Sequence, residues 1–134
     1  MSAAKISLAF NTLPFELEKA DGTTLFAVMT ELSGQRRNEY MDFVDSKVKR
    51  DESGGPIGMK SWKGSQTKIL SLCLHYAEMD EDGRPVEQGS SFKPLGLIKE
   101  TELTTWPDAA LQLLSKSAVQ LSRLNETPEE AGNG

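Results

Sequence analysis

The side chains best suited to catalysis in this sequence are its one cysteine and its one histidine, Cys73 and His75. Two residues apart, they would share a face of a strand, whereas a helix would point them in roughly opposite directions. A catalytic cysteine–histidine pair also needs a third group that orients the histidine. A structural zinc site needs about four ligands. We therefore predict no catalytic residue, no metal site and no cofactor.

An acidic stretch, "EMDEDG", has part of the pattern of a calcium-binding loop. Glu78, Asp80 and Asp82 have the spacing of the first, third and fifth ligands, and Gly83 stands at the required glycine. The twelfth position needs a glutamate that binds through both oxygens, and it is occupied by Gly89. The pattern therefore favours an Asp-Gly turn on an acidic surface.

A third stretch, "MKSWKGSQTK" (59–68), combines Trp62 with Lys60, Lys63 and Lys68. Lysines next to an aromatic ring can bind single-stranded nucleic acid by charge and stacking. The whole chain carries a net charge of −5, which opposes nucleic-acid binding. We interpret Trp62 as packing on the core or contacting a partner protein, and a small RNA-binding regulator is the less favoured alternative.

The first elements expected to position these residues are strands. Asp21-Gly22 separates two apolar stretches, and this dipeptide is a strong hairpin signal because both residues tolerate positive φ. The pattern predicts strands near 14–19 and 24–29. The segment "KISLAF" (5–10) adds a candidate third strand.

Three helices are expected after the hairpin. The first spans 34–50, with Ser33 as a plausible N-cap residue. The segment 67–79 fits either a helix or a buried strand, and we favour a helix over about 65–77. The last helix spans 107–125 and begins at a proline, a residue favoured in the first helical turn.

These elements predict an α+β, mainly helical fold with an N-terminal β-hairpin or small antiparallel sheet followed by three or so helices. The 134 residues suffice for one core, so we expect a single globular domain over 1–125 and a disordered acidic tail over 126–134. The single cysteine suits a reducing compartment. The N-terminus does not read as a signal peptide, and no apolar run reaches the ~20 residues that span a bilayer. A cytoplasmic protein is expected.

Two of the predicted helices are amphipathic. The helix 34–50 has Tyr40, Met41, Val44 and Val48 on one face and Phe43 beside it. The helix 107–125 carries a stripe of apolar residues that is sustained over four turns. Both faces could serve the core alone or the core and a partner, since aromatic residues and methionine are enriched at protein interfaces. The candidate interaction residues are Tyr40, Met41, Phe43, Val44, Trp62, Leu114, Leu121 and Leu124.

The order of several segments resembles the tail assembly chaperones of long-tailed bacteriophages. The segments are "TLFAVMTELSGQRRNEYM" (24–41), the apolar "ILSLCL" (69–74), the acidic turn "DEDGRPV" (80–86) and the helix end "LSRLN" (121–125). In that family a strand region leads into a helix with a similar opening, and then an apolar stretch runs into an acidic Asp-Gly turn. A helix closes the chain. The resemblance covers roughly residues 24–125.

The resemblance implies a protein without catalytic activity that binds the tape measure protein, a long helical chain prone to aggregation. Such chaperones keep this client soluble until tail-tube subunits assemble, and they are absent from the finished virion. The resemblance also implies self-association, and a longer frameshifted form whose extension recruits the tail-tube protein. It implies that Phe43, Leu114, Leu121 and Leu124 contact the client or another copy. No nucleic acid or membrane is expected as a partner.

The main rival to the chaperone is a structural phage tail protein that stays in the virion, such as a tube or completion subunit. Such subunits are usually richer in strands than a helix-dominated chaperone. The sequence alone leaves this alternative open.

Overall fold

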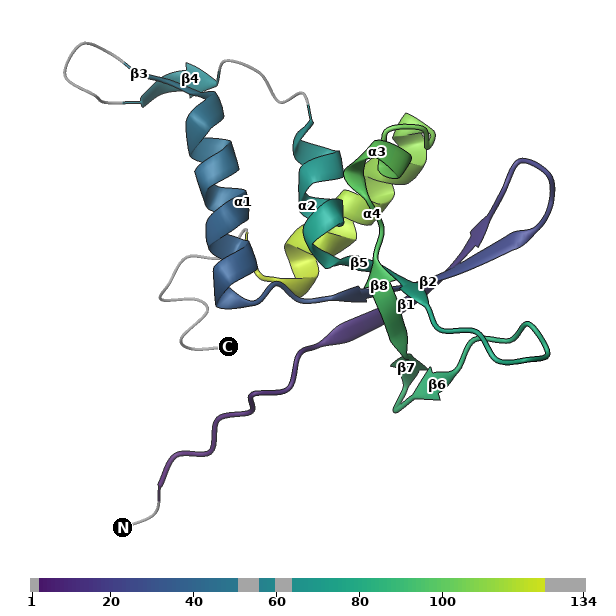
Figure 1. Cartoon of the computed structure of the whole chain (residues 1–134). Coiled ribbons are helices and arrows are strands. Elements are labelled where there is room, and N and C mark those ends of the chain that lie inside the picture. The colour runs from purple at the N-terminus through teal and green to yellow at the C-terminus, as the bar shows by residue number, and fades with distance from the viewer. Residues whose placement is uncertain (1–2, 51–55, 60–63, 125–134) are drawn as a thin grey trace.

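The structure, a computed structural model, describes residues 3–50, 56–59 and 64–124. Over these residues it contains a four-stranded antiparallel sheet, two short two-stranded sheets and four helices (Figure 1). The predicted α+β fold with a small antiparallel sheet is thus confirmed. The prediction of a mainly helical chain is not confirmed, because eight strands accompany the four helices in the described residues. The predicted acidic tail, 126–134, lies outside them.

The first two strands form the predicted hairpin. Strand β1 (Thr12–Glu18) pairs antiparallel with β2 (Thr24–Thr30) along its whole length. Gly22 in the turn has φ of 86°, a conformation that glycine adopts without steric cost. The Asp-Gly signal therefore located the turn correctly.

The segment with two readings, 67–79, contains both a helix and a strand. Helix α2 (Ser65–Cys73) ends where strand β5 (Leu74–Ala77) begins. The predicted helix to residue 77 was therefore too long. Strand β5 lies between β2 and β8 (Pro94–Leu97), and its hydrogen bonds to these two strands replace those of a longer helix.

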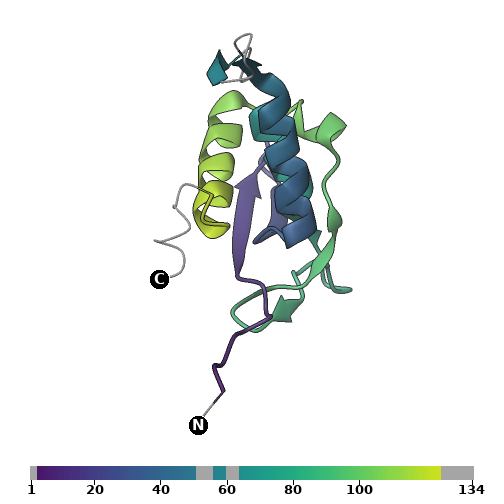
Figure 2. The ribbon, with the colours of Figure 1, turned by 90° about the vertical axis from the view of Figure 1, so that its left-hand side faces the viewer.

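The predicted third strand at 5–10 is not present. Residues 3–10 form an extended segment outside the sheet, here called the N-terminal arm, and every residue in it is exposed. Its direction explains the missing pairing, because β2 ends opposite Thr12 at Thr30 and the chain then turns into α1. The arm consequently runs away from the body of the protein in both views (Figures 1 and 2).

Helix α1 (Gly34–Lys47) begins as predicted and ends earlier. The Ser33 hydroxyl accepts a hydrogen bond from the Arg36 backbone N–H at 3.2 Å, which is the expected N-cap contact. The prediction of a helix to residue 50 was wrong at its end. Residues Val48–Arg50 form strand β3, which pairs with β4 (Pro56–Met59).

Helices cover one face of the four-stranded sheet. Helix α4 (Asp108–Leu121) packs against α2, and the short α3 (Glu100–Leu103) packs against α2 as well. Pro107 is the N-cap residue of α4 and not its first helical residue, and the helix ends at Leu121, so the predicted range 107–125 was too long. The core lies between these helices and the sheet. Its buried residues are Ala27, Met29, Leu32, Ile69, Leu70, Leu72, Cys73, Leu74, Ile98, Leu103, Leu111, Leu114 and Ala118.

A small hairpin contacts the other face of the sheet. Strands β6 (Glu87–Gln88) and β7 (Ser91–Phe92) pair with each other, and β7 contacts β1 and β2. The rings of Phe92 and Phe26 meet edge to face, with their centroids 5.8 Å apart. This contact covers part of the second face near the start of β2.

Ser122→Ala is expected to lower the free energy of unfolding by about 1–3 kcal/mol. The buried Ser122 hydroxyl accepts a hydrogen bond from the Leu32 backbone N–H at 2.8 Å, and alanine would leave that N–H buried without a partner. Chemical denaturation measures the change. Ser117→Ala, in the helix that ends just before Ser122, is the control, because its hydroxyl donates to the Leu113 carbonyl four residues earlier. Equal effects of the two substitutions would contradict this role of Ser122.

Candidate functional site

Helix α1 is attached to the other helices at its N-terminal end. Arg36 donates from Nη1 to the Leu72 carbonyl, near the end of α2, at 3.2 Å. Arg37 donates from Nη1 to the Ser122 carbonyl, just past the end of α4, at 3.1 Å. Two cations thus satisfy the carbonyls at the negative ends of two helices. These contacts fix the start of α1 beside the ends of α2 and α4.

The remainder of α1 carries large apolar side chains, yet none of its residues is fully buried. Tyr40, Phe43 and Val44 are partly buried, and Met41 is 46% exposed. Tyr40 packs against the core, and this burial raises the pKa of its hydroxyl. In Figure 2, α1 lies along the near side of the molecule, with the sheet behind it. Helix α1 thus offers apolar surface that the core does not use.

Within α1, Phe43 and Met41 differ in exposure. Phe43 is partly buried, and its Cζ atom would lie 3.8 Å from a Cβ built on Gly64, at the start of α2. The Lys47 ammonium lies 5.2 Å from the centre of the Phe43 ring. Met41, one of the candidate interaction residues, is exposed. Met41 is therefore the exposed large apolar side chain of α1 that is available to a partner.

The apolar stripe of α4 divides between core and surface. Leu114 is only 3% exposed and belongs to the core, so it has no surface for a partner. Leu121 and Leu124 are partly buried and pack against the core, as do Tyr40 and Val119. These four side chains are here called the helix-end cluster. Leu114 is thus buried in the core, whereas the side chains of the helix-end cluster remain partly exposed.

The remaining candidate, Trp62, lies outside the described residues, as do Lys60 and Lys63. Lys68 is on α2 and partly buried. The alternative nucleic-acid site therefore has only Lys68 within the described residues.

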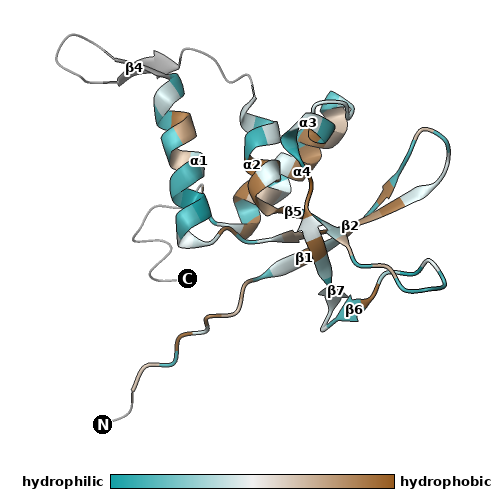
Figure 3. Ribbon diagram, viewed as in Figure 1, coloured by the Kyte–Doolittle hydropathy of each residue, from teal (hydrophilic) through white to brown (hydrophobic). Residues whose placement is uncertain are grey.

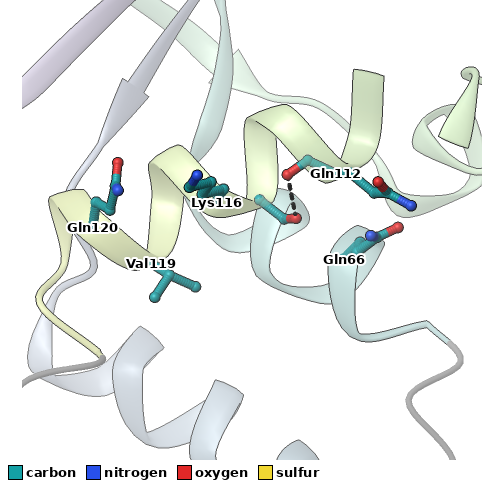
Figure 4. A pocket seen from close by; sticks show the side chains of 6 residues that line it. Gln66, Gln112, Lys116, Val119 and Gln120 are labelled. Atoms are coloured by element: carbon teal, nitrogen blue, oxygen red, sulfur yellow. Dashed lines mark hydrogen bonds between the residues drawn. The ribbon is translucent and has the colours of Figure 1, made fainter. Parts of the chain in front are cut away.

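A pocket of about 420 Å³ lies beside the helices (Figure 4). It is lined by Gln66 of α2 and by five residues of α4, Gln112, Ser115, Lys116, Val119 and Gln120. Amides, a hydroxyl and one ammonium line it together with Val119 and the aliphatic parts of the longer side chains. Such a lining offers hydrogen bonds to a polar or acidic segment placed next to the helix-end cluster. Sequence reasoning missed this pocket because its glutamines carry no chemical motif.

The cysteine–histidine pair is arranged poorly for catalysis. Cys73 is the last residue of α2 and lies in the core, while His75 is in β5. Burial raises the pKa of the Cys73 thiol to about 12, which the nearby Arg36 only partly offsets. Burial, with Arg36 adding to it, lowers the pKa of His75. At neutral pH the thiol is protonated, and a protonated thiol is a poor nucleophile.

The acidic stretch forms the predicted turn. The Asp80 carboxylate accepts hydrogen bonds from the backbone N–H groups of Asp82 and Arg84, each at 2.9 Å. Gly83 follows with φ of 77°, and Met79 bridges to Pro85. The Asp80 carboxylate thus stabilises the turn itself. Across the described residues no group of three or more acidic, histidine or cysteine side chains could hold a metal ion.

Comparisons with protein-family models, curated proteins and solved structures found no match to this chain. A search of the described helices found none long and apolar enough to cross a membrane. The interpretation of the site therefore rests on its residues.

Proposed function

We propose that this protein is a non-enzymatic tail assembly chaperone of a long-tailed bacteriophage. It binds the tape measure protein in the host cytoplasm, keeps it soluble and helps recruit tail-tube subunits through a frameshifted extension. It self-associates while doing so and is absent from the mature virion. Two things support the proposal: the resemblance of residues 24–125 to this family, and the exposed apolar surface of α1.

One observation carries the proposal. Helix α1 has fourteen residues, including Tyr40, Met41, Phe43 and Val44, and buries none of them fully. A helix that served only its own core would place these side chains inside it. A long helical client can lay its apolar face against such a surface, as amphipathic helices do in apolar grooves.

The neighbouring surfaces suit the same client. The helix-end cluster adds partly buried apolar side chains at the border of the core, and the pocket beside it can accept side chains from the edge of an amphipathic helix. Covering the client's apolar face lowers the concentration of its free, aggregation-prone form. Binding alone therefore supplies the proposed activity.

Co-expression with the tape measure protein tests the proposal. The client is expected to be soluble only when this protein is present, and the two are expected to co-purify. Mass spectrometry of purified virions is expected to detect the client and not this protein. Retention of this protein in the virion would favour a structural tail subunit instead, and a client that stays insoluble would contradict the chaperone function.

A further inference from the structure

The N-terminal arm exposes large apolar side chains in a regular pattern. Ile6 is 81% exposed, Leu8 is 91% exposed and Phe10 is 56% exposed. They stand at every second position, so an extended arm presents all three on one side. Apolar positions along this arm are visible in Figure 3, where the arm leaves the body of the protein. Such a pattern is that of a strand that lacks a sheet.

A second apolar surface lies at the opposite end of the β1–β2 hairpin. Strand β5 pairs with β2 only over Ala27–Met29, so among the described residues Thr24–Phe26 pair with β1 and with no strand on the β5 side. Past Ala77 the chain leaves β2, and Glu78 bonds to Lys93 and Val86 instead. The resulting notch is a cavity of about 240 Å³ lined by Thr24, Leu25, Phe26, Tyr76, Ala77, Met79 and Leu95.

The notch combines the two features that bind an extended segment. It exposes apolar side chains, since Leu95 is 66% exposed and Met79 is also exposed. It also borders a stretch of strand with pairing on one side only, and extended segments add to such sheet edges. We infer that the N-terminal arm of one copy of this protein docks in the notch of a second copy as an added strand.

The arm's own notch is out of its reach in this geometry. The arm leaves β1 at Thr12, whereas the notch lies beside Thr24, which pairs with Glu18 at the other end of the hairpin. Seven residues of strand separate these ends by about 20 Å. To lie on the β5 side of β2, the arm would also have to cross the β1–β2 ladder. A second copy meets neither obstacle.

Charge favours the same pairing. Among residues 3–10 the one charged side chain is Lys5. Beside the notch, Met79 is followed directly by the exposed acidic residues Asp80, Glu81 and Asp82. The basic arm and the acidic rim attract each other, whereas two notches or two arms would not.

The pairing joins two different surfaces of the chain, so copies associate head to tail. Such contacts generate rings when the rotation closes and open arrays when it does not. The inference specifies which surfaces join when copies self-associate. It rests on the proposed function only for what the assembly does. It needs no client.

Sedimentation of the purified full chain, without client, tests the inference. The natural protein is expected to form oligomers whose size grows with concentration. Leu8→Asp in the arm and Leu95→Asp in the notch are each expected to weaken association at least about 100-fold, because each places a carboxylate in the apolar contact. Leu113→Asp, at a residue on α4 that is 70% exposed, is the control and is expected to leave association unchanged.

Mixing the two variants gives the sharpest result. The arm variant keeps an intact notch and the notch variant keeps an intact arm, so the mixture is expected to form dimers and nothing larger. A natural protein that stays monomeric at every concentration overturns the inference, as does association that survives either substitution or a mixture that remains monomeric. None of these outcomes bears on client binding, which the co-expression experiment measures separately.

Discussion

Leu114→Ala is expected to lower the free energy of unfolding by about 2–5 kcal/mol, the largest effect among the substitutions proposed for the fold. Leu114 is 3% exposed in the core between α4, α2 and the sheet, and alanine would leave a cavity there. A domain is typically stable by only about 5–15 kcal/mol. The melting temperature is therefore expected to fall by roughly 6–25 °C, measured by circular dichroism.

The preceding residue on the same helix supplies a matched control. Leu113 is exposed, and Leu113→Ala is expected to change the stability by no more than about 0.5 kcal/mol. Because both substitutions replace leucine by alanine in α4, helix propensity cancels between them. A Leu114→Ala variant that is as stable as the natural protein but has lost client binding would contradict the placement of Leu114 in the core. Leu114 would then be a residue that contacts the client.

Met41→Asp is expected to weaken binding to the tape measure protein at least about tenfold without lowering the melting temperature. Met41 is exposed on α1, so the carboxylate disturbs no core contact, whereas a client that covers this position would bury an unpaired charge. Titration of a labelled helical client segment measures the change in affinity.

Met41→Leu is the matched control for this position. Leucine keeps the volume and apolar character of methionine, so client binding is expected to stay within a few-fold of the natural protein. Equal binding by Met41→Asp and Met41→Leu would show that the client does not contact this side of α1.

Those parts of the fold that depend on local sequence could be predicted. The Asp21-Gly22 dipeptide located the turn of the β1–β2 hairpin, because Gly22 adopts positive φ there without steric cost. Helix α4 followed from an apolar stripe at helical spacing. The start of α1 followed from Ser33, whose hydroxyl can cap a helix wherever that helix lies.

Element ends that depend on distant strands could not be predicted. Helix α2 stops at Cys73 because Leu74–Ala77 pair with β2 and β8, which lie far away in the sequence. Within "ILSLCLHYA" the apolar residues satisfy the helical period first and the strand period afterwards, so no local signal marks the change. Helix α1 ends at Lys47 because β3 pairs with β4 beyond a gap in the described chain.

The candidate site was predicted only in part, for the same reason. A stripe of leucines identifies the inward side of α4, but it does not say how far the core extends along it. The core takes Leu114, while Leu121 and Leu124 pack at its border. The exposure of the N-terminal arm was also missed, because the alternation in "KISLAF" predicts a strand and says nothing about its partner.

The central claim is that exposed apolar surface on α1 holds a helical client in solution. Its most direct test is light scattering while the tape measure protein is diluted from denaturant with increasing amounts of this protein. We expect scattering to fall in proportion to the natural protein added and to stay high with Met41→Asp. Scattering that is the same with and without the natural protein would contradict the claim.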